Sequence, residues 1–281
     1  MDYKIVVDSC GELTGKMKMS GVYTTASLSM QVDGDTIVDD ASFDQEDFLK
    51  RVAASPECPK SSCPSPEEYM RLYEGPEKRV YAVTLSAELS GSYNSAELGR
   101  KLFAEEHAGE EKEIYVFNSR SASVGETLIG MKIRDCEEAG LGFEETVRTV
   151  EDYISGQHTY FVLENLDTLR KNGRLTGIKS FVASALNIKP VMGSTPQGTI
   201  CQLGQARGIR RALVKMADQV ARDARDTAGK VLAIAHCNCP ERAREVERML
   251  LDRLKVKASF IVDTAGISTM YANDGGIIVV I

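Results

Sequence analysis

The sequence predicts an α/β protein of two domains: a parallel, Rossmann-like sheet domain, then a smaller α/β domain with a mixed or antiparallel sheet. Short β-rich runs alternate with helix-like stretches in the first half, which is typical of βαβ units and a parallel sheet. The length of 281 residues allows two modest domains. The pattern of predicted strands and helices changes at Ser155-Gly156-Gln157, so we expect domains at 1–157 and 158–281.

Hydrophobic runs and helical periodicity define the elements of the first domain. Strands are predicted for the β-rich runs 4–7, 79–85 and 113–117. Helices are predicted where apolar residues recur at helical spacing, at 43–54, 66–74, 92–106, 124–139 and 143–155. Ser65, Pro66 and Glu68 suit the N-cap, the first helical position and the capping-box acid of the second of these helices.

The second domain combines single strands, helices and one hairpin. Residues 190–203 predict the hairpin, with Pro196-Gln197-Gly198 as its turn. The remaining strands are predicted at 159–163, 230–235, 257–262 and 276–281. Helices are predicted at 178–187, 207–226 and 240–253.

Composition excludes several classes of protein. A hydrophobic fraction of 43% supports a packed core, and a net charge of −7 argues against nucleic acid or an anionic membrane surface as partner. No run approaches the roughly 18 apolar residues that cross a bilayer, and the apolar run near the N-terminus is too short for a signal peptide. Seven irregularly spaced cysteines indicate free thiols. We therefore expect a cytoplasmic protein.

Small polar residues collect where the first three predicted strands end. Asp8-Ser9, Ser86 and Asn118-Ser119 follow them, and Ser90-Gly91-Ser92 directly precedes a helix. Because the carboxyl ends of parallel strands share one edge, these residues predict a common crevice. A helix N-terminus suits an anion such as a carboxylate or phosphate, whereas the alternative role of Ser90 or Ser92 is helix capping alone. Ser61 and Ser62, in the loop before another helix, are free to face the same ligand.

Catalytic and metal sites find little support. There is no Gly-x-Ser-x-Gly elbow and no Walker A loop, and of the three histidines only His158 and His236 are candidate bases. Neither of these two histidines lies among the small polar residues that follow the first three predicted strands. His236-Cys237-Asn238-Cys239 offers three metal-binding side chains, but no second cluster completes a site, so a buried turn is the favoured interpretation. We expect no catalytic residue, no cofactor and no metal.

A basic stripe marks the predicted helix at 207–226. Arg207, Arg210, Arg211 and Lys215 recur at helical spacing on an otherwise acidic chain. They form either a solvated helix face or a docking patch for an acidic partner.

Several short motifs, in this order, resemble the DegV family over nearly the whole chain. They are Val7-Asp8-Ser9, the segment from Ser61 to Tyr69, the segment from Thr84 to Ala96, the segment from Asn118 to Gly125, Leu163-Glu164-Asn165-Leu166 with Gly173-Arg174-Leu175, the segment from Leu186 to Pro190, and Ala206-Arg207-Gly208. The resemblance implies a two-domain DegV-like fold that binds a long-chain fatty acid. It also implies that the protein hands this ligand to a separate kinase and is not itself an enzyme.

The resemblance also implies which residues bind the ligand. The carboxylate would contact Ser61 or Ser62 together with Ser90 and Gly91, and we add Ser119 from the polar crevice. Arg207 matches a family position linked to partner docking, and Arg210 and Arg211 lie beside it in the sequence. The acyl chain would lie in an apolar tunnel, for which we select Leu166, Ile178, Phe181, Val182 and Leu186.

One departure from the family lies near the C-terminus. Many members carry a histidine in a Gly-Thr-His-x-Gly-Pro-Gly type stretch, whereas residues 267–276 contain none. Tyr271, or Ser268 and Thr269, are the candidate replacement donors. Two alternatives to fatty acid binding and delivery stay open: a small-molecule hydrolase or transferase that uses the serine crevice, and an interaction module in which lipid is only a filler.

Overall fold

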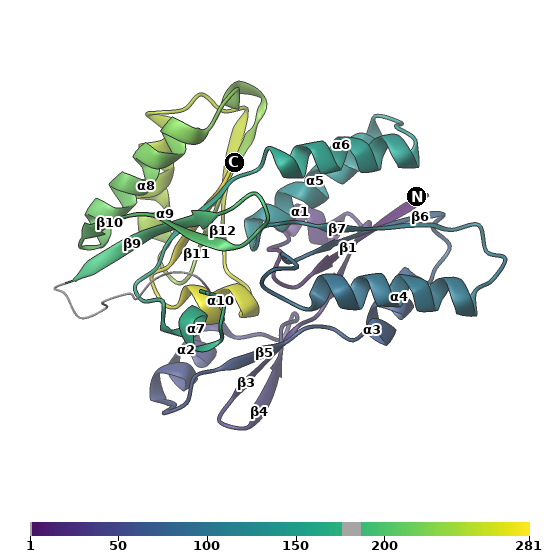
Figure 1. Ribbon diagram of the computed structural model, residues 1–281, viewed down its shortest axis with the longest axis horizontal. Helices are drawn as coiled ribbons and strands as arrows, with labels where there is room; N and C mark the ends of the chain where they lie inside the picture. The colour runs from purple at the N-terminus through teal and green to yellow at the C-terminus, as the bar shows by residue number, and fades with distance from the viewer. Residues whose placement is uncertain (1, 176–186) are drawn as a thin grey trace.

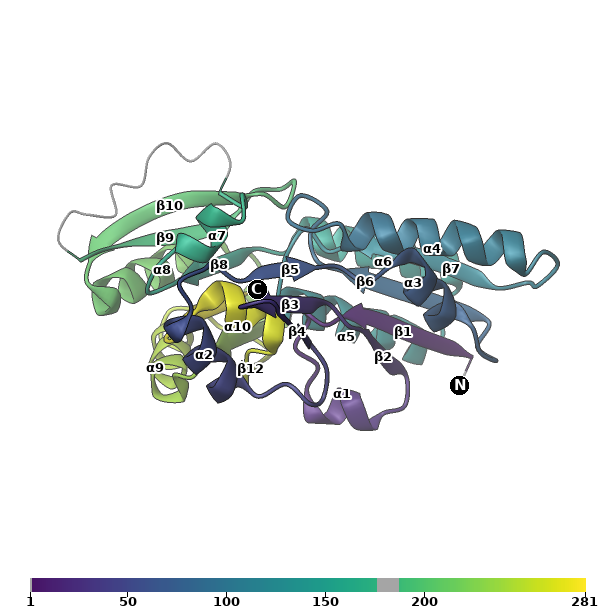
Figure 2. The same cartoon turned by 90° about the horizontal axis from the view of Figure 1, so that it is seen from below.

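A computed structural model describes residues 2–175 and 187–281 (Figures 1 and 2). Its strands form a four-stranded sheet, a six-stranded sheet and a three-stranded sheet. The two larger sheets lie side by side, and the small sheet lies below the junction between them in Figure 1. The predicted parallel sheet and mixed sheet are both confirmed, while the small sheet was not predicted.

The four-stranded sheet is parallel and covered on both faces. Its order is β2 (Tyr23–Ala26), β1 (Tyr3–Asp8), β6 (Arg79–Thr84) and β7 (Glu113–Asn118). Successive side chains point to opposite faces, so Val6 packs with α3 (Pro66–Tyr73) and α4 (Ser92–Glu106), and Val7 with α5 (Val124–Glu138) and α6 (Phe143–Ser155). Two covered faces explain why these strands are almost continuously apolar.

The six-stranded sheet is mixed. Its order is β10 (Ile200–Arg207), β9 (Ile188–Ser194), β8 (Thr159–Val162), β13 (Ile277–Val280), β11 (Val231–His236) and β12 (Ala258–Asp263). Only β11 and β12 pair in parallel; every other neighbouring pair is antiparallel. Helices α8 (Ile209–Asp223) and α9 (Pro240–Leu251) cover one face, and α5 packs on the other.

The small sheet and several short helices were not predicted from the sequence. The sheet has the order β4 (Asp35–Val38), β3 (Ser29–Val32) and β5 (Lys60–Ser62), all antiparallel. Beside it lie α2 (Gln45–Ala54) and α10 (Gly266–Ala272), as Figure 2 shows. Helix α2 agrees with the helix predicted at 43–54, whereas α10 was missed. The other missed helices are α1 (Gly15–Met19) and α7 (Asp167–Lys171), and a 3-10 turn spans Thr227–Gly229. Elements of three to seven residues are too short to show a clear hydrophobic period.

One predicted boundary is wrong. The helix expected over 207–226 begins only at Ile209, and Arg207 is the last residue of β10. The pairing of β10 with β9 continues to Arg207 through an irregularity between Gln202 and Gly204, and Gly208 then turns the chain at φ +82°. The predicted helix over 178–187 falls almost wholly outside the described residues, together with Ile178, Phe181, Val182 and Leu186.

The tip of the β9–β10 hairpin joins the two larger sheets. Ser86 Oγ, beyond the end of β6, donates a hydrogen bond of 2.9 Å to the carbonyl oxygen of Gly198. Gly198 has a φ of +91°, and an added Cβ would lie 2.3 Å from Ser86 Oγ and 2.8 Å from the Cα of Arg120. The close approach between the sheets therefore requires glycine at this position.

Replacing Gly198 by alanine tests this junction. We expect Gly198→Ala to lower the free energy of unfolding by about 2–4 kcal/mol, because overpacking adds to the strain of a positive φ. Gly109→Ala is the matched control, since Gly109 also has a positive φ, +108°, but nothing within 4 Å of an added Cβ. Urea denaturation of both variants measures the difference; equal losses would contradict the importance of the contact.

Candidate functional site

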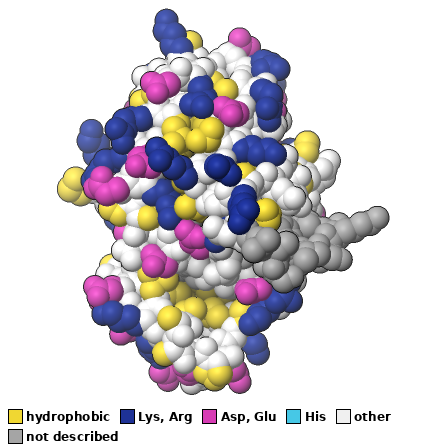
Figure 3. All heavy atoms as spheres, turned by 90° about the vertical axis from the view of Figure 1, so that its left-hand side faces the viewer, with side chains coloured by type: hydrophobic (Ala, Val, Ile, Leu, Met, Phe, Trp, Pro, Cys, Tyr) yellow, Lys and Arg dark blue, Asp and Glu magenta, His cyan; other side chains and the backbone are white. Residues whose placement is uncertain are grey.

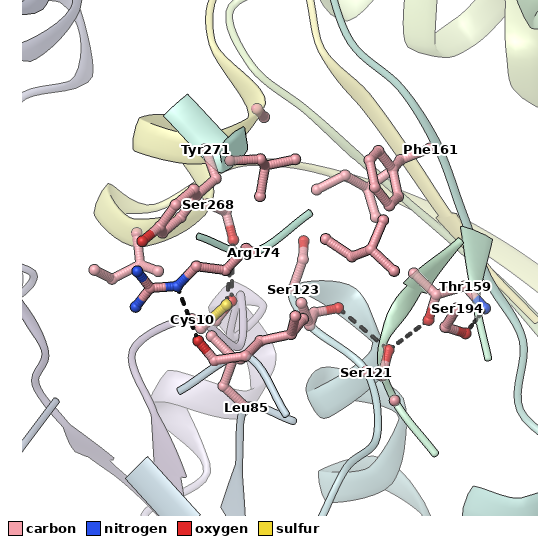
Figure 4. A pocket seen from close by; sticks show the side chains of 18 of the residues that line it. Cys10, Leu85, Ser121, Ser123, Thr159, Phe161, Arg174, Ser194, Ser268 and Tyr271 are labelled. Atoms are coloured by element: carbon pink, nitrogen blue, oxygen red, sulfur yellow. Dashed lines mark hydrogen bonds between the residues drawn. The ribbon is translucent and has the colours of Figure 1, made fainter. Parts of the chain in front are cut away.

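An apolar cavity lies between the two larger sheets and beside the small one (Figure 4). Its empty space, counted together with the solvent at its open mouth, is about 760 Å³. The wall is built from the loops after β1, β6 and β7, from β8, the β9–β10 hairpin and β13, and from α7 and α10. The apolar residues of the wall are Leu85, Leu89, Ala122, Phe161, Leu163, Leu169, Ile200, Ile267, Ala272 and Ile278.

Arg174 and Tyr271 form a polar group in this wall. The guanidinium carbon of Arg174 lies 5.8 Å from the centre of the Tyr271 ring, and its Nε donates to the carbonyl oxygen of Leu89 at 3.1 Å. The Tyr271 hydroxyl lies 2.9 Å from Ser61 Oγ. Burial raises the pKa of Tyr271, so the phenol stays protonated and able to donate at neutral pH. A cation and two hydroxyls beside an apolar cavity suit the head group of an amphipathic anion.

Polar side chains also line the other side of the cavity, but their hydroxyls have hydrogen-bond partners within the protein. Ser121 Oγ lies 2.6 Å from Thr159 Oγ1, and Ser194 Oγ accepts from the Thr159 amide at 3.3 Å. In Figure 4 these three residues lie across the cavity from Tyr271 and Arg174. Because each of these hydroxyls already has a hydrogen-bond partner within the group, this side presents little polar surface to a ligand.

The predicted residues Ser61, Ser62, Ser90 and Gly91 come together beside the cavity but do not line it. A Cβ placed on Gly91 would lie 3.1 Å from Cys63 Sγ, which brings the two segments into contact. Ser61 and Ser62 are neighbours on β5 and therefore point to opposite sides. Ser61 reaches Tyr271, whereas Ser62 is exposed.

The start of α4 distinguishes the serines that flank Gly91. Gly91 itself is the N-cap, without a capping side chain, and Ser90 Oγ accepts from the Ser92 amide at 3.2 Å. Ser92 is buried, and its hydroxyl donates to Asp8 Oδ2 at 2.6 Å. Ser92 therefore has a structural role, and Ser90 lies one residue beyond the wall residue Leu89.

Ser119 does not line the cavity. Its hydroxyl donates to the carbonyl oxygen of Ser121 and accepts from the amide of the same residue, both at 3.1 Å. These bonds shape the loop that brings Ser121 and Ser123 into the wall.

Leu166, from the predicted tunnel, packs beside the wall residues Phe161 and Leu169 without lining the cavity itself.

Of the candidate replacements for the family histidine, two reach the cavity. Tyr271 and Ser268 line it, and Ser268 Oγ donates to the carbonyl oxygen of Cys10 at 3.2 Å. Thr269 is buried away from it and donates to the carbonyl oxygen of Thr264 at 3.2 Å.

Arg174 was not selected as a site residue from the sequence, although it belongs to the motif Gly173-Arg174-Leu175. A lone arginine gives no pattern that separates it from surface cations.

Three buried carboxyl groups lie behind the wall. Asp8 accepts from the amides of Leu85 and Cys10 and from Ser92, whereas Glu126 has no hydrogen-bond partner for either oxygen among the described residues. Burial, reinforced by the neighbouring Asp8, raises the pKa of Glu126 far above its usual range. Glu12 accepts from Ser123 Oγ at 2.6 Å, and burial raises its pKa to about 7.

The described part of the chain shows no group of three side chains able to hold a metal ion. No histidine is found among the described residues that line the cavity. His236 lies at the end of β11, with Nδ1 3.3 Å from Asp263 Oδ1, and neighbouring Cys237 is fully buried. Within residues 2–175 and 187–281, no helix has the length and apolarity to cross a membrane.

Comparisons with known proteins identify the family. A family model for DegV proteins matches residues 2–281. The chain belongs to the DegV family. A DegV domain-containing protein of Streptococcus pneumoniae R6 is 32% identical over 283 aligned positions, covering 99% of this chain and 98% of that protein. The resemblance inferred from the sequence motifs is therefore confirmed.

Two solved structures of DegV proteins are close to this chain. A DegV family protein of Ruminococcus gnavus, refined with vaccenic acid, is 63% identical, with a TM-score of 0.97 and full coverage of both chains. The Fatty Acid Kinase (Fak) B3 protein of Streptococcus pneumoniae, loaded with linoleic acid, is 32% identical, with a TM-score of 0.89 and coverage of 100% of this chain and 99% of that one. Both structures carry a fatty acid within the DegV fold.

The elevated pKa of Glu12 predicts a pH-dependent stability. Between the unfolded value of about 4.3 and the folded value of about 7, only the unfolded chain loses this proton, so rising pH favours unfolding. Above this window the penalty is constant, on the order of 4 kcal/mol at most. We expect Glu12→Gln to gain stability relative to the wild type between pH 5 and pH 8. Urea denaturation at both pH values measures this gain, and parallel pH profiles would contradict it.

Proposed function

We propose that this protein binds a long-chain fatty acid, with the acyl chain in the cavity and the carboxylate at Ser61, Tyr271 and Arg174. The observation that carries the proposal is the juxtaposition of an almost wholly apolar cavity wall with this group of donors. Two DegV proteins at least 32% identical to this chain have structures with fatty acids bound.

The energetics of such a ligand match the site. Each methylene group that leaves water contributes about 0.8 kcal/mol, so a long acyl chain binds tightly through apolar contacts alone. The carboxylate then needs donors, because an unpaired charge next to apolar side chains is strongly unfavourable. Arg174 supplies the opposite charge, while the Ser61 and Tyr271 hydroxyls supply directed hydrogen bonds.

Ser90 and Gly91 complete the proposed head-group site from the start of α4. The Ser92 amide donates to Ser90 Oγ, but Gly91 offers no capping side chain to the later amides of the first turn, which are therefore able to attract an anion. Among the two β5 serines we favour Ser61, since it bonds to Tyr271 while Ser62 is exposed. Ser119 acts through the loop of Ser121 and does not touch the ligand in this proposal.

We further propose that the protein presents its fatty acid to a separate kinase and performs no chemistry itself. The support is the 32% identity to the protein named as a B3 component of fatty acid kinase. Arg207, Arg210 and Arg211 are exposed at the end of β10 and the start of α8. Figure 3 views this side of the molecule and shows many Lys and Arg side chains over its upper half. We assign these three arginines to the contact with the kinase.

A hydrolase or transferase is the less favoured alternative. Such an enzyme needs a base beside its serine nucleophile, and the wall of the cavity offers no histidine. A second alternative is that the fatty acid is a permanent structural filler. An exchange experiment distinguishes it from the proposed function, because a bound fatty acid that never exchanges with added fatty acid would support a filler role.

Mass spectrometry of an organic extract is the direct test. Protein purified from a bacterial host is denatured and extracted, and the lipid fraction is quantified. We expect about one fatty acid per chain. An empty extract, from protein that also takes up no added fatty acid, would overturn the proposal.

Substitutions at the hydroxyl pair test the head-group site. We expect Ser61→Ala and Tyr271→Phe each to weaken fatty acid binding about tenfold or more, because each removes a hydrogen bond to a charged group. Ser62→Ala is the matched control on the same strand and should change the Kd less than about twofold. Calorimetric titration of delipidated protein measures these values; an equal effect of all three substitutions would contradict the assignment.

Charge reversal on the basic face tests kinase docking. We expect Arg210→Glu combined with Arg211→Glu to lower acyl phosphate formation with a fatty acid kinase subunit by about tenfold, while the Kd for fatty acid stays unchanged. Lys16→Glu with Lys18→Glu makes the same charge change on exposed residues of α1 and serves as control. Equal losses in both double variants would indicate a general charge effect instead of docking.

A further inference from the structure

Helix α10 carries a large share of the cavity wall yet has little stability of its own. Ile267, Ser268, Tyr271 and Ala272 all line the cavity. The helix has only seven residues, fewer than an isolated helix needs to persist in water. Its place must therefore be set by contacts with neighbouring elements, and the place of the Tyr271 hydroxyl depends on them.

Asp39 makes such a contact at the start of α10. Its Oδ1 accepts from the Gly266 amide at 2.7 Å, and its Oδ2 accepts from the Ile267 amide at 2.9 Å. The side chain thus satisfies two of the free amides of the first turn, and a negative charge suits this end of a helix. Asp39 follows β4 directly, is 2% exposed, and its own amide donates to the carbonyl oxygen of Leu28 at 2.9 Å.

The fit at Gly266 indicates how closely Asp39 holds the helix. A Cβ at this position would lie 2.6 Å from Asp39 Oδ1 and 2.4 Å from Met30 Cε. Met30 belongs to β3, the central strand of the small sheet. The backbone of α10 therefore rests directly against the small sheet at its first residue.

The same sheet holds the other end of α10. Ser61 on β5 bonds to Tyr271, and β5 pairs with β3 through Ser61 and Met30. The small sheet thus contacts the start of the helix through Met30, beside Asp39 directly after β4, and contacts the helix near its end through Ser61. A shift of the helix start would move the Tyr271 hydroxyl away from Ser61 and from Arg174.

We infer that Asp39 is a positioning residue for the carboxylate site: it fixes α10 so that Tyr271 faces the head group of the ligand. This inference rests on the proposed function. It implies that loss of the Asp39 carboxylate weakens recognition of the head group more than it weakens binding of the acyl chain.

The test compares two probes on delipidated protein: an 18-carbon monounsaturated fatty acid and the alcohol with the same chain. We expect Asp39→Ala to raise the Kd of the acid about tenfold and to leave the Kd of the alcohol within about twofold. Asp39→Asn keeps the shape of the side chain and one hydrogen-bond acceptor, so we expect an intermediate loss of affinity for the acid. This variant also replaces Asp39→Ala in the test if the alanine variant fails to fold.

Thr14→Ala is the matched control. Thr14 caps α1 by accepting from the Met17 amide at 3.3 Å, so its loss removes a helix cap on an element that packs against the parallel sheet. We expect it to leave the ratio of the two Kd values unchanged. We also expect Tyr271→Phe to add little in the Asp39→Asn background, because both substitutions act on the same hydroxyl.

The outcomes separate this inference from the proposed function. If the wild type prefers the acid and the Asp39 variants lose affinity for acid and alcohol equally, Asp39 is only structural and the inference is overturned. Additive effects of Asp39→Asn and Tyr271→Phe would also overturn it. A wild type that binds neither probe would overturn the proposed function together with the inference.

Discussion

The packing of α5 between the two larger sheets is the contact on which the rest of the molecule depends. Ile129 and Ile133 pack against the parallel sheet, while Val124 and Leu128 pack against the mixed sheet. A helix buried on both sides joins the two sheets into one unit. The loop before α5 then contributes Ser121, Ala122 and Ser123 to the cavity wall, so the site exists only where both sheets meet.

The charges around the site follow from this burial. Arg174 lies in the wall, whereas the carboxyl groups of Asp8, Glu12 and Glu126 lie behind it. Burial raises the pKa of each of these acids and so favours their neutral forms.

Much of the fold, but less of the site, was predictable. The strands at 79–85 and 113–117 are long apolar runs whose pattern does not depend on partners, and both form. The small sheet was missed because strands of three or four residues with polar members have no measurable period. Ser61 belongs to this sheet, so its contact with Tyr271, distant by 210 positions, had no local signal.

Local sequence patterns are enough to establish the α/β class, the alternation of helices with buried strands, and the clustering of small polar residues at strand ends. These properties follow from local periodicity and from the rule that parallel strands end at one edge. Which hydroxyls face the cavity, in contrast, depends on the folded molecule. Ser92 and Ser119 bond inward to Asp8 and to the backbone of Ser121, while Ser61 reaches Tyr271. That choice depends on side-chain directions and long-range hydrogen bonds, which a linear pattern does not encode.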